Sequence, residues 1–122
     1  MNKFLKHAVE EANKSELAHR VGCVIYHSNK IVSRGYNSKR NVKSITKKFI
    51  RWPGSIHAEI DAIIKAKVSL KGMTALVIRL NKKGQLRLAK PCEHCTMYLH
   101  YVGIKKVIYS TNLGELQVEE VV

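Results

Sequence analysis

Residues 57–95 read HAEIDAIIKAKVSLKGMTALVIRLNKKGQLRLAKPCEHC, and this stretch decides the fold. Its first part is strongly apolar and predicts a buried helix that starts near His57 and ends before Gly72. Residues 75–80 form a continuous apolar run followed by a turn sequence, which is typical of a buried strand. A second helix is expected over residues 92–102, because a proline precedes it and a glycine follows it. Helices alternating with a buried strand indicate an α/β fold.

The flanking segments supply the other elements. Apolar residues recur at spacings of three and four in residues 3–16, which predicts an amphipathic helix. Two β-rich runs, residues 21–26 and 31–36, are separated by a short polar turn and predict a hairpin. Residues 104–110 and 116–122 are expected to be two further strands, the second folding back on the first. The order predicts a helix–sheet–helix sandwich around a mixed sheet of about five strands.

Length and composition predict a single domain over residues 1–122, large enough to bury one core. No apolar run reaches the roughly 20 residues of a membrane span, and no secretion signal is recognisable, so we expect a cytoplasmic protein without a membrane partner. Three cysteines are too few for a disulfide framework and favour metal binding or catalysis.

The charge is strongly positive. Lys and Arg number 22 against 9 Asp and Glu, a net charge of +13. A generally basic, soluble surface would explain this excess, but so would a phosphate-bearing substrate or a nucleic acid. Residues 38–55 are rich in Lys and Arg, lack a clear period, and are predicted to form a long substrate-binding loop.

Two short motifs carry the chemistry. Cys92 and Cys95 are three residues apart, so both thiolates can hold one ion from the same face of a helix. His57 would add a third ligand, and one imidazole with two thiolates is a donor set that zinc prefers. Three protein ligands leave a fourth position open, which is typical of catalytic zinc. His57 and Glu59 can reach one site only at a helix end, because residues two apart diverge in mid-helix.

Alternatives to this interpretation remain at the sequence level. A structural zinc would need a fourth ligand, for which His94 is the candidate. Glu59 could itself close the site, but we favour a carboxylate beside the metal that transfers protons. Cys23 lies in an apolar strand and is interpreted as a small buried side chain.

His57-Ala58-Glu59 followed by Pro91-Cys92-x-x-Cys95 resembles the motif pair of the cytidine deaminase-like superfamily, and the resemblance extends over nearly the whole chain. It implies the fold of that superfamily, zinc bound by the His and both Cys, and Glu59 as the residue that shuttles protons. It also implies a zinc-activated water that replaces the amino group at C4 of cytosine or C6 of adenine.

The same resemblance implies substrate contacts. Gly35-Tyr36-Asn37 is similar to the Gly-aromatic-Asn sequence of nucleotide and transfer-RNA deaminases, which places Asn37 at the sugar. The backbone at Ala58 would hold the base. Trp52 is either an anchor of its loop in the core or a platform on which a base stacks.

The expected function is zinc-dependent deamination of cytosine to uracil in a phosphate-bearing pyrimidine nucleotide, most simply a (deoxy)cytidylate, with residues 38–55 gripping phosphate. The second hypothesis is a deaminase acting on cytosine or adenine in single-stranded DNA or RNA. A third is a non-catalytic nucleic-acid-binding protein on the same fold. Relatives commonly self-associate, so a homo-oligomer is also expected.

Overall fold

The computed structural model describes residues 2–39 and 56–121. The helices in these ranges are α1 (Leu5–Ala12), α3 (Ala58–Lys65) and α4 (Glu93–Tyr101). The strands are β1 (Arg20–His27), β2 (Lys30–Tyr36), β3 (Thr74–Leu80), β4 (Leu86–Arg87), β5 (Lys106–Ser110) and β6 (Leu116–Glu120). None of these helices has the length and apolar character that a membrane span requires.

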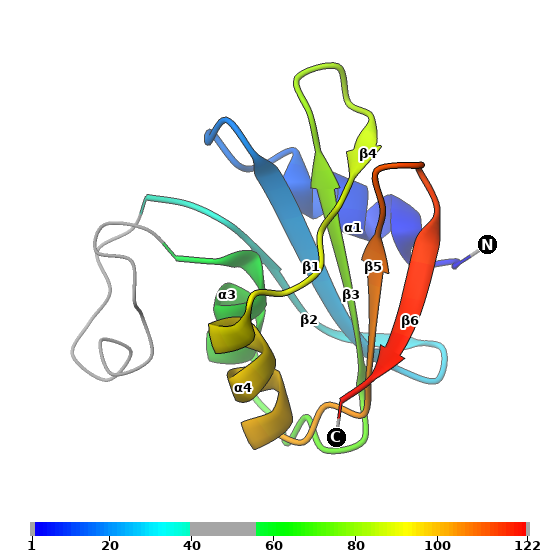
Figure 1. Ribbon diagram of the computed structural model, residues 1–122. Coiled ribbons are helices and arrows are strands. Elements are labelled where there is room, and N and C mark those ends of the chain that lie inside the picture. Colours follow the sequence, from blue (N-terminus) through cyan, green and yellow to red (C-terminus); the bar gives the residue numbers. More distant parts are fainter. Residues whose placement is uncertain (1, 40–55, 122) are drawn as a thin grey trace.

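The strands form one mixed sheet in the order β2-β1-β3-β5-β6 (Figure 1). The pairs β1–β2, β1–β3 and β5–β6 are antiparallel, whereas β3–β5 is parallel. The parallel pair results from α4, which carries the chain from the far end of β3 back to the start of β5. The short strand β4 pairs with the end of β3 beyond the last residue that pairs with β5.

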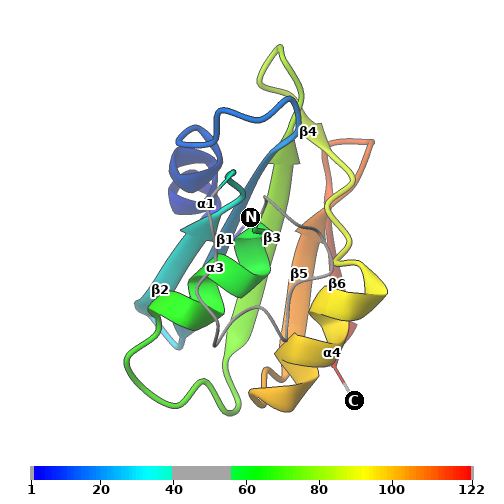
Figure 2. The same ribbon diagram turned by 90° about the vertical axis from the view of Figure 1, so that its left-hand side faces the viewer.

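Helices cover both faces of the sheet, with α1 on one face and α3 and α4 side by side on the other (Figures 1 and 2). Ala8 and Ala12 of α1 pack against Leu76 and Ile78, which lie on its face of β3. Ala75 and Val77 of β3 lie in the core on the opposite face, because successive residues of a strand point to opposite sides.

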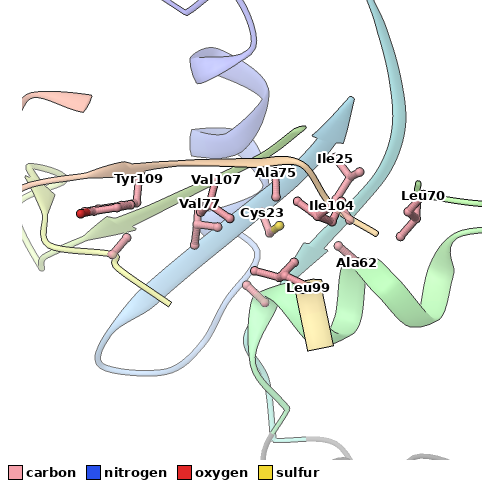
Figure 3. Packing of buried hydrophobic residues seen from close by; sticks show 12 residues of the cluster. Cys23, Ile25, Ala62, Leu70, Ala75, Val77, Leu99, Ile104, Val107 and Tyr109 are labelled. Atoms are coloured by element: carbon pink, nitrogen blue, oxygen red, sulfur yellow. The ribbon is translucent and has the colours of Figure 1, made fainter. Parts of the chain in front are cut away.

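The larger core lies between the sheet and the helix pair α3 and α4. Figure 3 shows Cys23 and Val77 from the strands packed with Ala62 of α3 and Leu99 of α4. All four side chains are fully buried. Cys23 is therefore a packing residue, as the sequence predicted. Figure 3 also shows Tyr109, a residue of β5 that belongs to the same core.

Two glycines set how closely the helices approach the sheet. A Cβ atom at Gly22 would lie 2.2 Å from the Ala8 carbonyl oxygen of α1. A Cβ atom at Gly35 would lie 2.4 Å from the Ala58 carbonyl oxygen and 2.3 Å from the Ala62 nitrogen of α3. Only glycine permits these contacts between strand and helix backbones.

The structure confirms the predicted helix–sheet–helix architecture and corrects its details. The sheet has six strands rather than about five, because β4 was not expected. A two-residue strand carries no period that a sequence pattern reveals. The first helix ends at Ala12 rather than Glu16, and the Ser15 hydroxyl then accepts the Leu17 N–H in a turn.

The other boundaries shift by a few residues. Helix α3 ends at Lys65, and so before Gly72 as predicted, because the backbone at Ala66 is extended. Strand β5 begins at Lys106 rather than residue 104. Strand β6 ends at Glu120 and forms the predicted hairpin with β5.

Candidate active site

The site is built on the N-termini of α3 and α4. His57 is the N-cap residue of α3, and Glu59 follows in the first turn of the helix. Cys92 is the N-cap residue of α4, and Cys95 lies one turn on. The two N-termini carry backbone N–H groups without helical partners and the positive end of each helix dipole. They therefore favour thiolates and other anions between them.

The packing of α3 on α4 brings the three predicted ligands together. The donor atoms of His57, Cys92 and Cys95 all lie within 4.8 Å of one another. The Cys95 Sγ atom is 3.4 Å from Nδ1 of His57. The Cys95 backbone N–H donates to Cys92 Sγ at 3.5 Å, as in a helix cap.

This donor set fits zinc, which binds imidazole nitrogen and thiolate sulfur in a tetrahedron. Within the part of the chain that the structure describes, the group of mutually close donors holds these three side chains and not His94. The ring of His94 instead packs edge-on to Tyr98, with centroids 4.9 Å apart. Three ligands leave room for a fourth, non-protein ligand.

The titration behaviour of the three side chains suits a metal site. A hydrogen bond from the Cys95 thiol lowers the pKa of Cys92 to about 5. That same bond, together with burial, raises the pKa of Cys95 well above its ordinary value. Burial lowers the pKa of His57, which keeps the imidazole in the neutral form that binds metals.

Glu59 is buried, with 5% of its surface exposed, and lies beside this group. Burial raises the pKa of its carboxyl to about 7, and the negative charge of Cys92 adds to the effect. A carboxyl with a pKa near neutrality can both accept and donate a proton at working pH. Burial and a raised pKa are compatible with an acid–base role for Glu59, which stays a prediction of the sequence.

A cavity of about 290 Å³ opens onto the site, and Ala58 and Asn37 line it with His57, Glu59 and Cys92. Ala58 belongs to the first turn of α3, where backbone N–H groups lack helical partners. The Asn37 carboxamide accepts the Val21 N–H at 2.9 Å and donates to the His19 carbonyl at 2.6 Å. The amide retains one N–H and one lone pair for a ligand.

Of the segment predicted to bind phosphate, residues 38–55, the structure describes only the first two residues. Ser38 and Ile56 form an isolated antiparallel bridge, so the chain leaves and re-enters the fold at one point. Trp52 and the other residues from 40 to 55 lie outside the described part.

Sequence reasoning missed several residues that line the cavity, namely His19, Val21, Arg79, Leu88, Ala89 and Lys90. A signal existed for Arg79, the only charged residue in the otherwise apolar run 75–80. Lys90 directly precedes the cysteine motif.

A family model described as the cytidine and deoxycytidylate deaminase zinc-binding region matches residues 1–111. The chain belongs to this family. Membership accounts for the paired motifs and assigns the chain to zinc-binding deaminases, with His57, Cys92 and Cys95 as the candidate ligand group. No curated protein sequence matches the chain.

Solved structures of this deaminase superfamily share the fold. Cytidine deaminase from Burkholderia pseudomallei has a TM-score of 0.65 at 14% identity, covering 99% of this chain and 94% of that chain. The dCMP deaminase of cyanophage S-TIM5, solved in complex with dCMP and dUMP, has a TM-score of 0.57 at 20% identity, covering 89% and 82%. A diaminohydroxyphosphoribosylaminopyrimidine deaminase/reductase from Thermotoga maritima is 26% identical, with a TM-score of 0.56, and covers 87% of this chain but 28% of that chain.

Proposed function

We propose that this protein catalyses the hydrolytic deamination of cytosine to uracil in a phosphate-bearing nucleotide, most simply a (deoxy)cytidylate. The observation that carries the proposal is the position of Glu59. Its buried carboxyl lies beside a three-ligand metal group, and both border one cavity. Membership in the cytidine and deoxycytidylate deaminase family supports the reaction, and the solved complex of a relative with dCMP and dUMP supports the substrate class.

Each residue has a defined part in this proposal. His57, Cys92 and Cys95 would hold zinc, which when bound supplies a Lewis acid that lowers the pKa of a coordinated water to about 7. Glu59 accepts a proton from the attacking water at its carboxylate and donates it to the base, so that ammonia can leave. The backbone N–H of Ala58 contacts the base, and the Asn37 carboxamide contacts the sugar.

The test is mass-resolved deamination by the zinc-loaded protein of a panel of cytosine and adenine nucleosides, nucleotides and single-stranded oligonucleotides. We expect uracil formation from the cytosine nucleotide. Glu59→Gln should reduce the rate by at least roughly 100-fold while zinc remains bound at one equivalent, because the acid–base group alone is removed.

Glu115→Gln is the matched control, since Glu115 lies in the exposed turn before β6 and its replacement removes the same charge away from the cavity. Its rate should equal that of the wild type. Full activity of Glu59→Gln would contradict the role of Glu59. Release of no ammonia from any member of the panel would contradict deamination and favour a non-catalytic binding protein.

The net charge of +13 favours a second candidate, deamination of a base within single-stranded DNA or RNA. The same panel separates the two candidates. Turnover of oligonucleotides with little turnover of mononucleotides would identify the polymer as the substrate.

A further inference from the structure

Arg79 is the last residue of β3 on the face that carries the site. Ala75 and Val77, which share this face, are fully buried in the core against α3 and α4. Arg79 continues their row, is partly buried, and lines the cavity that also contains Glu59 and Cys92. The long cationic side chain of Arg79 thus lies at the edge of the core and borders the candidate active site.

The position of Arg79 relative to Asn37 follows from the strand register. Val21 of β1 is the register partner of Arg79, and its N–H donates to the Asn37 carboxamide. Asn37, which directly follows β2, therefore forms a row with Val21 of β1 and Arg79 of β3, and all three line the cavity. Two strand spacings separate the backbones of Asn37 and Arg79 by roughly 10 Å.

In the described part of the chain, no acidic side chain forms an ion pair with the Arg79 guanidinium. Among residues 2–39 and 56–121 it enters no ion pair and no side-chain hydrogen bond, whereas its backbone N–H donates to the Ser110 hydroxyl at 3.1 Å. Lys90, the other strong cation of the cavity, lies 3.3 Å from a carboxylate oxygen of Glu119. A partly buried cation without an anion loses hydration that a bound anion would compensate.

Arg87 provides the contrast on the neighbouring strand. It is the register partner of Arg79 on β4, yet it is not among the residues that line the cavity. Its guanidinium donates to the Asn112 carbonyl at 3.2 Å and to the Gln85 side chain at 3.3 Å. Of this pair of arginines, only Arg79 is left available to a ligand in the cavity.

We propose that Arg79 binds the phosphate group of the substrate and makes the protein selective for a nucleotide over the corresponding nucleoside. The inference rests on the proposed deamination and names the residue that recognises phosphate. The planar guanidinium donates two parallel hydrogen bonds to phosphate oxygens, a geometry that an ammonium group does not reproduce. With the base at Glu59 and the sugar at Asn37, the row across the strands leaves the phosphate at Arg79.

The experiment compares deoxycytidylate with deoxycytidine as substrates of the zinc-loaded protein and of Arg79→Ala, Arg79→Lys and Arg87→Ala. Arg79→Ala should lower kcat/KM for the nucleotide by roughly 10- to 100-fold, the loss expected for hydrogen bonds to a charged group. Its kcat/KM for the nucleoside should stay nearly unchanged. Arg79→Lys should recover part of the loss, and Arg87→Ala, which removes the same charge from the adjacent strand, should change neither substrate.

Calorimetric binding of the products dUMP and deoxyuridine to the same variants separates this inference from the proposed function. Tighter binding of dUMP than of deoxyuridine, lost in Arg79→Ala, would support the phosphate contact even if no deamination occurred. Equal losses for nucleotide and nucleoside would overturn it, as would an undiminished preference for the nucleotide in Arg79→Ala. In either of these cases the proposed function would still be tested separately, by whether the protein deaminates its substrates.

Discussion

Cys92 and Cys95 have very different pKa values in the protein without metal. The Cys95 thiol donates to Cys92, which lowers the pKa of Cys92 to about 5 and raises that of Cys95. At neutral pH one thiolate is therefore ready to bind zinc, and the second cysteine must lose its proton on binding.

We therefore expect zinc binding to release about one proton at neutral pH and to weaken as the pH falls. Calorimetric titration in buffers of different ionisation enthalpy measures the released proton. Cys95→Ser should weaken zinc binding by more than the roughly 10- to 100-fold that is lost when only a supporting contact to a ligand is removed. Cys23→Ala is the matched control and should still bind one equivalent, because Cys23 packs in the core. Binding without proton release would contradict this assignment.

Glu59 makes the stability of the metal-free protein depend on pH. Its pKa rises from 4.5 to about 7 on burial, so between these values the unfolded chain ionises this carboxyl while the folded protein holds it protonated. The stability that the protein gains by holding this carboxyl protonated is fully present below pH 4.5 and is lost as the pH rises through 7.

Replacing Glu59 by Gln should remove this loss. We expect the free energy of unfolding of Glu59→Gln, relative to wild type, to increase by about 3 kcal/mol between about pH 4 and pH 8. Urea denaturation in the presence of a chelator at several pH values measures the difference. Parallel pH profiles for the two proteins would show that the carboxyl ionises as easily when folded as when unfolded.

At the scale of elements, the approach of α3 to β2 sets the position of His57. Gly35 lies against the backbone of α3 at Ala58, the residue next to His57 in sequence. A methyl group at position 35 would force the helix away from the sheet, and with it one metal ligand.

Gly35→Ala is thus expected to destabilise the fold by about 1–3 kcal/mol, as overpacking does, and to weaken zinc binding as well. Gly84→Ala is the control, because Gly84 has a φ of +78° but no atom within 4 Å of its added Cβ. It should lose about 1 kcal/mol from the strained backbone and bind zinc normally. Thermal unfolding and zinc titration measure both effects. Equal zinc affinity in the two variants would mean that Gly35 does not position the ligand.

For the whole molecule, the net charge of +13 concentrates anionic ligands at long range without identifying them. A strand of nucleic acid and a single nucleotide differ in how many phosphates they present. They therefore differ in their response to salt.

With a mononucleotide as substrate, we expect kcat/KM to fall by less than about tenfold between about 50 and 200 mM salt. Binding to a polymer through six to ten phosphates would fall by about 10³–10⁵ over the same range. Steady-state rates for deoxycytidylate and a cytosine-rich oligonucleotide across this range provide the comparison. A steep fall for the preferred substrate would favour the polymer.

The local sequence predicted much of the fold and the ligand set. Cys92 and Cys95 could be paired because three-residue spacing keeps two side chains on one face of a helix. The need for His57 and Glu59 to converge correctly predicted a helix end at His57, which is the N-cap residue of α3. The strand patterns likewise predicted the hairpins, since alternation and turn residues are encoded within a few positions.

Other features have no local pattern. Strand β4 exists because it pairs with the free end of β3, and Arg79 lines the site together with Asn37 because Val21 of β1 lies between them. By itself the sequence determined which helices and strands other than β4 form and which residue types can bind zinc, because period and spacing are properties of neighbouring residues. Only the tertiary structure decided that α3 packs on α4, that Glu59 is buried there, and that a cation lines the same cavity. These relations depend on long-range packing, for which residues far apart in the chain must first be brought together.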